Sequence, residues 1–348
     1  MARDFGPSSF SVFLAVFQFR KKSVELDRGI RKTMMNRSIY SKIIIFLIWA
    51  GISDCRLLRG NQIPLKDGST YESIVINGKT RNYWFHAPKQ TIGDRQKLPL
   101  ILVLHGRLGN GKNILEDSKF NAVSDKEGFF VAYPDGYNRS WADGRGATPA
   151  DREKVDDVLF LEKLIDHLSE LFPIASDRIF IVGHSNGGFM TQRMLIEKSK
   201  RFRAGVSVAS QISEFVLKNF EPQGNVSVAF INGTDDPTVP YYGGYVRDGG
   251  QILGVEDSVN RWLAWNSCSK NPKLETRDVK DDNTKLEIRS YDQCKGKTSV
   301  RLYKVIGGGH NWPGIERKIP FVGSLGTPTY ELDTAEDIWS FFRSTWEP

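Results

Sequence analysis

A serine flanked by glycines occurs in the segment Gly183–Gly187, which reads GHSNG and follows the apolar run Ile179–Val182. The spacing G-x-S-x-G between a strand and a helix places a nucleophile on a sharp, strained turn, so the flanking positions must lack bulky Cβ groups. The hydroxyl then stands at the top of a sheet, and the next backbone N–H points to where an oxyanion would form. The pattern predicts Ser185 as a nucleophile and Asn186 as an oxyanion donor.

A serine hydroxyl needs a base, because it is a weak nucleophile at its free pKa. The chain has five histidines, and only His310 lies C-terminal to Ser185. In folds that use this turn, the chain order is serine, then an acid, then histidine. His310 lies in the glycine loop VIGGGHNWPG after an apolar run, which lets it reach across to Ser185. We therefore predict His310 as the general base.

The acid that orients the base should follow a strand between Ser185 and His310. The segment VAFINGTDDPTVPYYGG offers Asp235 and Asp236 side by side. One of the two could serve only to start the turn, since Asp before Pro is a common turn starter. Asp236 is our choice from the residues, and Asp235 remains the alternative.

A second glycine loop resembles a phosphate-binding loop. Gly106–Lys112 matches G-x-x-x-x-G-K, but the next residue is Asn113, where the phosphate loop has a Ser or Thr that holds Mg²⁺. No convincing second metal ligand follows on a later strand. We expect no nucleotide, no metal and no other cofactor.

Two tryptophans fall on loops close to the predicted site. Trp141 lies in DGYNRSWADGRG, and Trp312 follows the predicted base by two residues. Such side chains could form a platform for an aromatic acyl group or a sugar face. Packing alone is the alternative explanation for both.

The elements that position these residues are apolar runs separated by helical periodicity. Strands are predicted around residues 98–106, 128–136, 178–183, 204–210, 226–233 and 299–309, with helices over 154–172 and 187–199 and a hairpin turning at Asn77-Gly78. Strands alternating with helices indicate an α/β fold with a mostly parallel central sheet flanked by helices. Ligands in such folds bind beyond the carboxyl ends of the strands, where the glycine loops fall.

Charge excludes one class of function. The chain of 348 residues has a formal charge of +7, and 40% of its residues are hydrophobic. Residues 1–53 carry nine Lys/Arg and three Asp/Glu, a charge of +6, which leaves +1 for residues 54–348. A nearly neutral globular part does not offer a basic face to nucleic acid.

The basic leader resembles a secretory signal. Positive charge precedes the apolar stretch Ile43–Ile52, which is followed by small or polar residues. About ten apolar residues are too few for a membrane span, which needs roughly 20. A start at Met34 or Met35 would give the signal its usual length. We expect export to a secreted or periplasmic location, a leader over residues 1–53, a linker over 54–68 and a catalytic domain over 69–348.

The three cysteines agree with export. Cys268 and Cys294 enclose a loop of about 25 residues and invite a disulfide in an oxidising compartment. Cys55 is the odd one, beside the processing site, and a lipid on it would need a smaller residue than Asp54 before it. Membrane contact is expected only through the leader, if it is uncleaved or lipidated.

Several motifs in order carry a resemblance that runs from about Leu98 to the C-terminus. They are LVLHG, GFFVAYPDG, VDDVLFLEKLID, GHSNGGFM, NGTDDPTVPYYGG, RWLAWNSC and GGGHNWPG. The chain resembles the secreted α/β-hydrolase esterases related to polyhydroxybutyrate depolymerases, feruloyl esterases and acetylxylan esterases. The resemblance implies an α/β-hydrolase fold, the triad Ser185, Asp236 and His310, a second oxyanion donor at Gly106-Arg107, and pairing of Cys268 with Cys294.

The implied activity is hydrolysis of feruloyl, acetyl or hydroxybutyryl esters by an exported serine esterase. The expected substrate is a plant cell-wall polysaccharide ester or a polyhydroxyalkanoate oligomer. Arg107 and Asn232 differ from the residues that the family often has there, and Arg107 changes the charge beside the acyl pocket. A serine peptidase on the same fold and a non-enzymatic binding protein on this scaffold are the alternatives.

Overall fold

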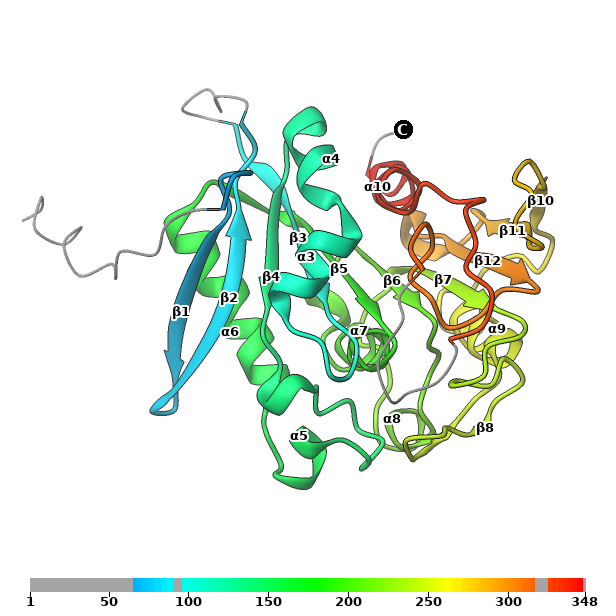
Figure 1. Cartoon of the computed structure of the whole chain (residues 1–348), viewed down its shortest axis with the longest axis horizontal. Coiled ribbons are helices and arrows are strands. Elements are labelled where there is room, and N and C mark those ends of the chain that lie inside the picture. The colour runs from blue at the N-terminus through cyan, green and yellow to red at the C-terminus, as the bar shows by residue number, and fades with distance from the viewer. Residues whose placement is uncertain (1–64, 90–95, 317–324, 347–348) are drawn as a thin grey trace, which may run out of the picture. The chain divides into compact units, whose positions relative to one another are not determined.

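The structure is a computed structural model that describes residues 65–89, 96–316 and 325–346 (Figure 1). The predicted leader and most of the predicted linker lie outside these residues, so the signal segment, the start at Met34 or Met35 and Cys55 stay predictions. Among the described residues, no helix has the length and apolarity needed to cross a membrane.

A mixed sheet of ten strands forms the centre of the domain, in the order β1-β2-β4-β3-β5-β6-β7-β12-β11-β10. The six inner strands, from β4 to β12, run parallel, and both edges are extended by antiparallel strands. This arrangement confirms the predicted, mostly parallel sheet. The strands are β1 (Thr70–Ile76), β2 (Lys79–His86), β3 (Leu98–Leu104), β4 (Phe130–Pro134), β5 (Ile174–His184), β6 (Ala204–Val208), β7 (Ser227–Gly233), β10 (Lys273–Arg277), β11 (Lys285–Tyr291) and β12 (Val300–Ile306).

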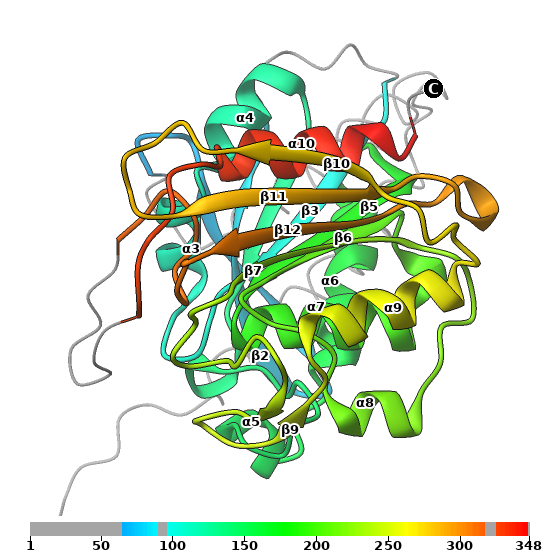
Figure 2. The same ribbon diagram turned by 90° about the vertical axis from the view of Figure 1, so that its right-hand side faces the viewer.

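Helices cover both faces of this sheet (Figures 1 and 2). Successive side chains of a strand point to opposite faces, and β3 shows this directly: Leu100 and Leu102 join one apolar core, Ile101 and Val103 the other. The first core contains residues of α6, α7 and α9, and the second contains residues of α3, α4 and α10. The helices are α3 (Gly111–Ser118), α4 (Phe120–Glu127), α5 (Pro149–Arg152), α6 (Asp157–Leu171), α7 (Asn186–Glu197), α8 (Glu214–Asn219), α9 (Val255–Trp265) and α10 (Thr334–Ser344).

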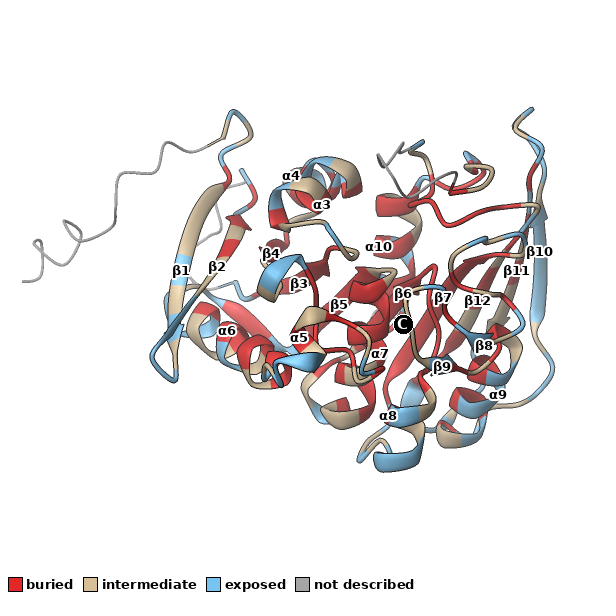
Figure 3. Ribbon diagram, turned by 60° about the horizontal axis from the view of Figure 1, so that its bottom comes forward, coloured by how far each residue is buried: buried red, intermediate tan, exposed pale blue. Residues whose placement is uncertain are grey.

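Burial increases from the edges of the sheet to its centre (Figure 3). Every residue of β3, β4, β6 and β7 is buried, which explains why these strands read as continuous apolar runs. The edge strand β1 is mostly half-buried and the edge strand β10 is largely exposed, and their sequences are alternating or polar. Strong hydrophobic signals therefore mark the inner strands, where the predicted site lies.

The sequence analysis predicted the inner strands and the first hairpin, whose turn at Asn77-Gly78 joins β1 and β2. It missed β10 and β11, because exposed β10 is polar and β11 alternates buried with half-buried residues, so neither forms an unbroken apolar run. It also missed the short hairpin of β8 (Gly244–Tyr245) and β9 (Gln251–Ile252), whose two-residue strands are too short for any periodicity.

A disulfide joins Cys268, just after α9, to Cys294, just after β11. The predicted pairing is therefore confirmed. Two backbone hydrogen bonds run beside it: Ser269 N–H donates to the Gln293 carbonyl, and Lys295 N–H donates to the Asn266 carbonyl. The bridge fastens the end of helix α9 to the segment that follows β11, the strand next to the edge of the sheet.

Removal of this bridge should lower stability. Cys294→Ser frees a loop with a sequence separation of 26 residues. Because a crosslink of this span restricts the unfolded chain, we expect a loss of about 3 kcal/mol in the free energy of unfolding. Urea unfolding should measure it, and the wild type under reducing conditions should match the variant. Equal stability of variant and oxidised wild type would contradict the expectation.

Candidate active site

Ser185 occupies the turn between β5 and α7, with φ 54° and ψ −119°. A non-glycine residue in this region carries backbone strain, which fits a nucleophile held on a sharp turn. The flanking glycines are needed for space. A Cβ on Gly183 would lie 2.2 Å from the Gly187 carbonyl oxygen, and one on Gly187 would lie 2.5 Å from that of His105. The G-x-S-x-G spacing is thus a steric requirement of this strand–turn–helix.

The structure brings together the three predicted triad residues. Nε2 of His310 lies 2.8 Å from Oγ of Ser185, and Nδ1 of His310 lies 2.6 Å from Oδ2 of Asp236. An ionised Asp236 accepts only, so Nδ1 carries the imidazole proton and Nε2 is left to accept from the serine hydroxyl. The order of contacts is the one that a serine nucleophile requires.

Asp236 is itself fixed by its own turn. Its Oδ1 accepts hydrogen bonds from the N–H groups of Thr238 (2.7 Å) and Val239 (2.8 Å), which leaves Oδ2 for His310. The neighbouring Asp235 is exposed, and its carboxylate accepts from the hydroxyl of Thr234. Of the two aspartates that the sequence offered, the structure places Asp236 against the base.

The glycine loop before His310 packs against the end of β7. A Cβ on Gly233 would lie 2.1 Å from the Gly308 carbonyl oxygen, so two glycine segments are in close contact here. The N–H of His310 donates to the Leu325 carbonyl at 2.6 Å. We expected these glycines to make the loop flexible enough for His310 to approach Ser185. The structure shows instead that they permit close backbone packing, which holds His310 in place.

Arg107 and Asn186 are placed to offer the two predicted oxyanion donors. The Gly106 carbonyl accepts from Nδ1 of His105 (2.7 Å) and from the Gly109 N–H (3.0 Å). Because a trans peptide directs its C=O and N–H oppositely, the Arg107 N–H points away from His105. Asn186 begins α7, where N–H groups lack helical partners. Neither N–H has an acceptor within the described parts of the chain.

His105 anchors the first of these donors. Its Nε2 accepts from the Gly136 N–H at 2.9 Å, so its proton is on Nδ1, which donates to the Gly106 carbonyl. Burial lowers the pKa of the imidazole to about 4, although the Gly106 carbonyl and Asp135 oppose the shift. His105 therefore remains neutral wherever the domain is folded near neutral pH.

This histidine should make stability depend on pH. Its folded pKa lies below the unfolded value of 6.5, so its contribution is complete above pH 6.5 and is lost as pH falls towards about 4. The loss should reach about 3 kcal/mol in the free energy of unfolding. Urea titrations between pH 7 and 4.5 should show a smaller decrease for His105→Asn than for wild type. An equal decrease in the free energy of unfolding for wild type and His105→Asn over this pH range would contradict the role given to His105.

Trp141 does not serve as the expected platform. Its side chain is fully buried (0% exposed), and its indole Nε1–H donates to the His105 carbonyl at 2.9 Å. Its backbone N–H donates to Oδ1 of Asn186 at 2.8 Å, and its carbonyl accepts from Nδ2 of Asn186. A buried indole offers no face to a ligand, so the prediction for Trp141 is wrong. The residue instead supports the two segments that carry the oxyanion donors.

Trp312 does line the catalytic cavity. The cavity has a volume of about 520 Å³ and contains Ser185 and His310 in its wall. Trp312 packs edge-on against His184, with ring centroids 6.2 Å apart. The wall combines four further apolar side chains with polar and charged ones. The apolar ones are Leu108, Ile114, Ile315 and Leu325, and the polar ones include Arg107, Asn113, Asp117, Arg139 and Asn311. Trp312 and Ile315 also border a second cavity of about 420 Å³, so the two spaces adjoin.

The near match to a phosphate loop has a different role. Gly106–Gly109 forms a turn in which the Gly109 N–H donates to the Gly106 carbonyl, and Gly111 begins α3 with the Asn110 side chain as its N-cap. Lys112 points to Glu116 on the exposed side of α3. Among the described residues, no group of His, Cys, Asp or Glu is arranged to hold a metal ion.

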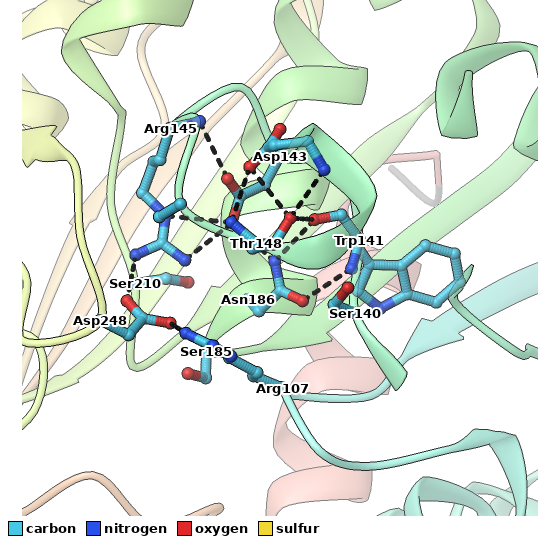
Figure 4. Close-up of polar contacts among 12 residues, drawn as sticks. Arg107, Ser140, Trp141, Asp143, Arg145, Thr148, Ser185, Asn186, Ser210 and Asp248 are labelled. Carbon is cyan, nitrogen blue, oxygen red and sulfur yellow. Dashed lines mark hydrogen bonds and ion pairs between the residues drawn. The ribbon is translucent and has the colours of Figure 1, made fainter. Parts of the chain in front are cut away.

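A buried charged cluster beside the elbow escaped the sequence analysis (Figure 4). Asp143 and Arg145 are joined by two hydrogen bonds, of 3.0 and 2.9 Å, and Arg145 also binds Asp248 at 2.8 Å. Burial raises the pKa of Asp143, and the attraction of Arg145 only partly opposes this. For Asp248, burial is outweighed by Arg145 and Arg107, which lower its pKa. The segments WADGRG and VRDGG read as polar turns and gave no sign that they meet.

Comparisons with known proteins find relatives that are named as esterases. A model of the Prolyl oligopeptidase family matches residues 121–221, less than a third of the chain. NocK of Nocardia uniformis subsp. tsuyamanensis, a protein named as an esterase, is 26% identical over 79% of this chain and 83% of its own length. Feruloyl esterase B of Piromyces equi is 26% identical over 64% of this chain and 41% of its own length.

A solved structure, an acetyl xylan esterase from Aspergillus awamori, superposes with a TM-score of 0.52 at 12% identity. The match covers 79% of this chain and 99% of that one, and at this identity it speaks for the fold alone. Together these findings confirm the predicted resemblance to esterases, the α/β-hydrolase fold and the assignment of the chain as an enzyme of the carboxylic ester hydrolase class.

Proposed function

We propose that this protein hydrolyses carboxylic esters through an acyl-enzyme formed on Ser185. The observation that carries the proposal is the continuous chain of contacts from Ser185 through His310 to Asp236, at the wall of a cavity large enough for a substrate. The proposal is supported by the relatives named as esterases.

The reaction has two steps that use the same groups. Nε2 of His310 takes the hydroxyl proton as Oγ of Ser185 attacks the ester carbonyl carbon, and the oxyanion accepts from the N–H groups of Arg107 and Asn186. His310 then returns the proton to the departing alkoxide, which leaves as the alcohol. A water molecule, deprotonated by His310, releases the acid and restores Ser185. Asp236 orients the imidazole and stabilises its charge throughout.

The two adjoining cavities leave room for both halves of an ester. The alcohol oxygen must be near Nε2 of His310 when it leaves, because this nitrogen returns the proton. Trp312 and Ile315 border both cavities, so a substrate with one half in the catalytic cavity has a second space beside it. This supports an ester with an extended alcohol, such as a feruloyl or acetyl ester of a cell-wall polysaccharide.

Of the three acyl groups, we favour the feruloyl type. Trp312 and the apolar side chains of the wall offer a planar aromatic acid more contact area than a short polar hydroxybutyryl chain could use. The similarity to Feruloyl esterase B supports the same choice. We also propose an exported protein, secreted or periplasmic, since the Cys268–Cys294 disulfide suits an oxidising compartment.

Ser185→Ala should abolish most turnover while leaving the fold unchanged. We expect kcat on a short p-nitrophenyl ester to fall by at least ~10³-fold, because no other group can form the acyl-enzyme. The melting temperature should remain close to that of wild type. Ser169→Ala on α6, where the hydroxyl bonds only the Ile165 carbonyl, is the matched control. Retention of most activity by Ser185→Ala would contradict the mechanism.

Trp312→Ala should affect aromatic substrates selectively. We expect kcat/KM for methyl ferulate to fall about 10-fold, while kcat/KM for ethyl acetate changes less than about 3-fold, because only the larger acyl group reaches the indole. Acid release in a pH-stat measures both on equal terms. A hydroxybutyrate oligomer and acetylated xylan complete the panel. Equal losses on methyl ferulate and ethyl acetate would contradict an aromatic acyl site.

A serine peptidase is the second candidate, because the matching family model is that of the Prolyl oligopeptidase family. The same triad can attack an amide, whose nitrogen leaving group also needs a proton from His310. Comparison of an anilide with an ester of the same acyl group separates the two candidates. Preference for the anilide would favour the peptidase.

A further inference from the structure

The two residues that offer oxyanion N–H groups are joined through their side chains. Arg107 Nη1 donates to Asp248 Oδ2 at 2.9 Å, and Arg145 Nη1 donates to Asp248 Oδ1 at 2.8 Å. Arg145 donates twice to Asp143 Oδ2, which also accepts from Asn186 Nδ2 at 2.6 Å. Figure 4 shows this chain of contacts beside Ser185. The chain of contacts begins at Arg107 and ends at Asn186, the two residues that offer the N–H groups.

The middle of the chain is deeply buried and the Arg107 end is partly open. The side chains of Arg145 and Asp143 are 1% and 0% exposed, whereas those of Arg107 and Asp248 are 32% and 24% exposed. Two arginines face two aspartates, so the charges balance. Loss of one partner from a buried set leaves an uncompensated charge, and the remaining groups must then rearrange.

Asp248 belongs to the turn between β8 and β9, which also contacts the other catalytic segments. Val246 and Ile252, on either side of this turn, form a small apolar cluster with Phe189 of α7 and Val239. Phe189 lies one helical turn after Ser185, and the Val239 N–H donates to Asp236. The turn is thus held against the nucleophile helix and the acid loop while its aspartate reaches Arg107.

Arg145 also holds the turn between β8 and β9 against helix α7. Its guanidinium carbon lies 4.1 Å from the centroid of the Phe189 ring, and its Nη1 also donates to the Gly249 carbonyl. A Cβ on Gly250 would lie 2.6 Å from Cβ of Arg145, so the turn backbone packs directly on this residue. Asp248 is therefore presented to Arg107 from a well-supported position.

We infer that Asp248 is a positioning residue for the oxyanion site, holding Arg107 in a fixed relation to Asn186 through Arg145 and Asp143. The inference rests on the proposed function. Two backbone donors stabilise an oxyanion only when both reach the same point, and a displacement of about 1 Å can cost about 10²-fold in rate. The backbone N–H of Arg107 survives any side-chain replacement, so such a variant keeps the donor and changes only what holds it; Asp248→Ala does so without removing a side chain that lines the cavity.

A double-mutant cycle on an activated ester tests this role. Arg107→Ala and Asp248→Ala should each lower kcat about 10-fold and leave KM within about 2-fold, since the donors act on the transition state. The double variant should be no slower than the slower single variant, because both changes release the same contact. Arg107→Lys should restore part of the rate. If Asp248→Ala does not fold, Asp248→Asn keeps the shape and removes the charge.

The pair Arg277–Asp337 provides a matched control. Its contact distance is 2.8 Å and its side chains are 33% and 15% exposed, close to the values for Arg107 and Asp248, but it joins β10 to α10. Arg277→Ala and Asp337→Ala should leave kcat unchanged. Melting temperatures of all variants show whether a rate change merely follows stability.

Three results would overturn the inference: single variants with kcat within about 2-fold of wild type, losses confined to KM, or single losses that multiply in the double variant. Failure of the proposed function has a different signature, namely a wild type that hydrolyses no ester. In that case the rate at which a fluorophosphonate labels Ser185 replaces kcat, because the phosphonyl oxygen uses the same N–H donors. Labelling rates equal in wild type, Arg107→Ala and Asp248→Ala would then reject the positioning role.

Discussion

The close approach of the first turn of α7 to the ends of β3 and β5 is the constraint on which the site depends. Ser185 has a strained backbone because the chain must reverse from strand to helix within one residue. Gly183 and Gly187 leave no space for a side chain at this contact. The strain is balanced by anchoring on both sides, with the Ser185 N–H bound to the Val208 carbonyl and Phe189 continuing the helix.

Around this turn, backbone geometry and buried polar groups do most of the positioning. Neutral His105 holds the Gly106 carbonyl, buried Trp141 holds Asn186, and Asp236 is held by the N–H groups of its own turn. Each of these contacts is a hydrogen bond in a low-dielectric interior, where a satisfied polar group is rigid and an unsatisfied one is costly. The predicted triad and the residues beside it are therefore held by contacts within the protein itself.

The charged chain from Arg107 to Asn186 extends the same principle to ionised groups. Buried ion pairs seldom add stability over apolar packing, so their retention here fits a role in fixing geometry. Arg107, at one end of this charged chain, also lines the catalytic cavity, whose wall combines apolar and polar side chains. In the proposed function, this cavity and the adjoining one hold the two halves of the ester.

The sequence by itself determined the elbow, the base and the pair of aspartates, because these depend on local steric rules and on the order of elements along the chain. It also determined the inner strands, whose burial on both faces leaves an unbroken apolar signal. Only the tertiary structure decided that Trp141 is enclosed in the core, whereas Trp312, although only 5% exposed, lines the cavity. Only the tertiary structure showed that Asp248 reaches Arg107, 141 residues away, through a turn with no periodic signal. Such contacts depend on how distant loops meet at the carboxyl edge of the sheet, and no local property of either loop encodes the meeting.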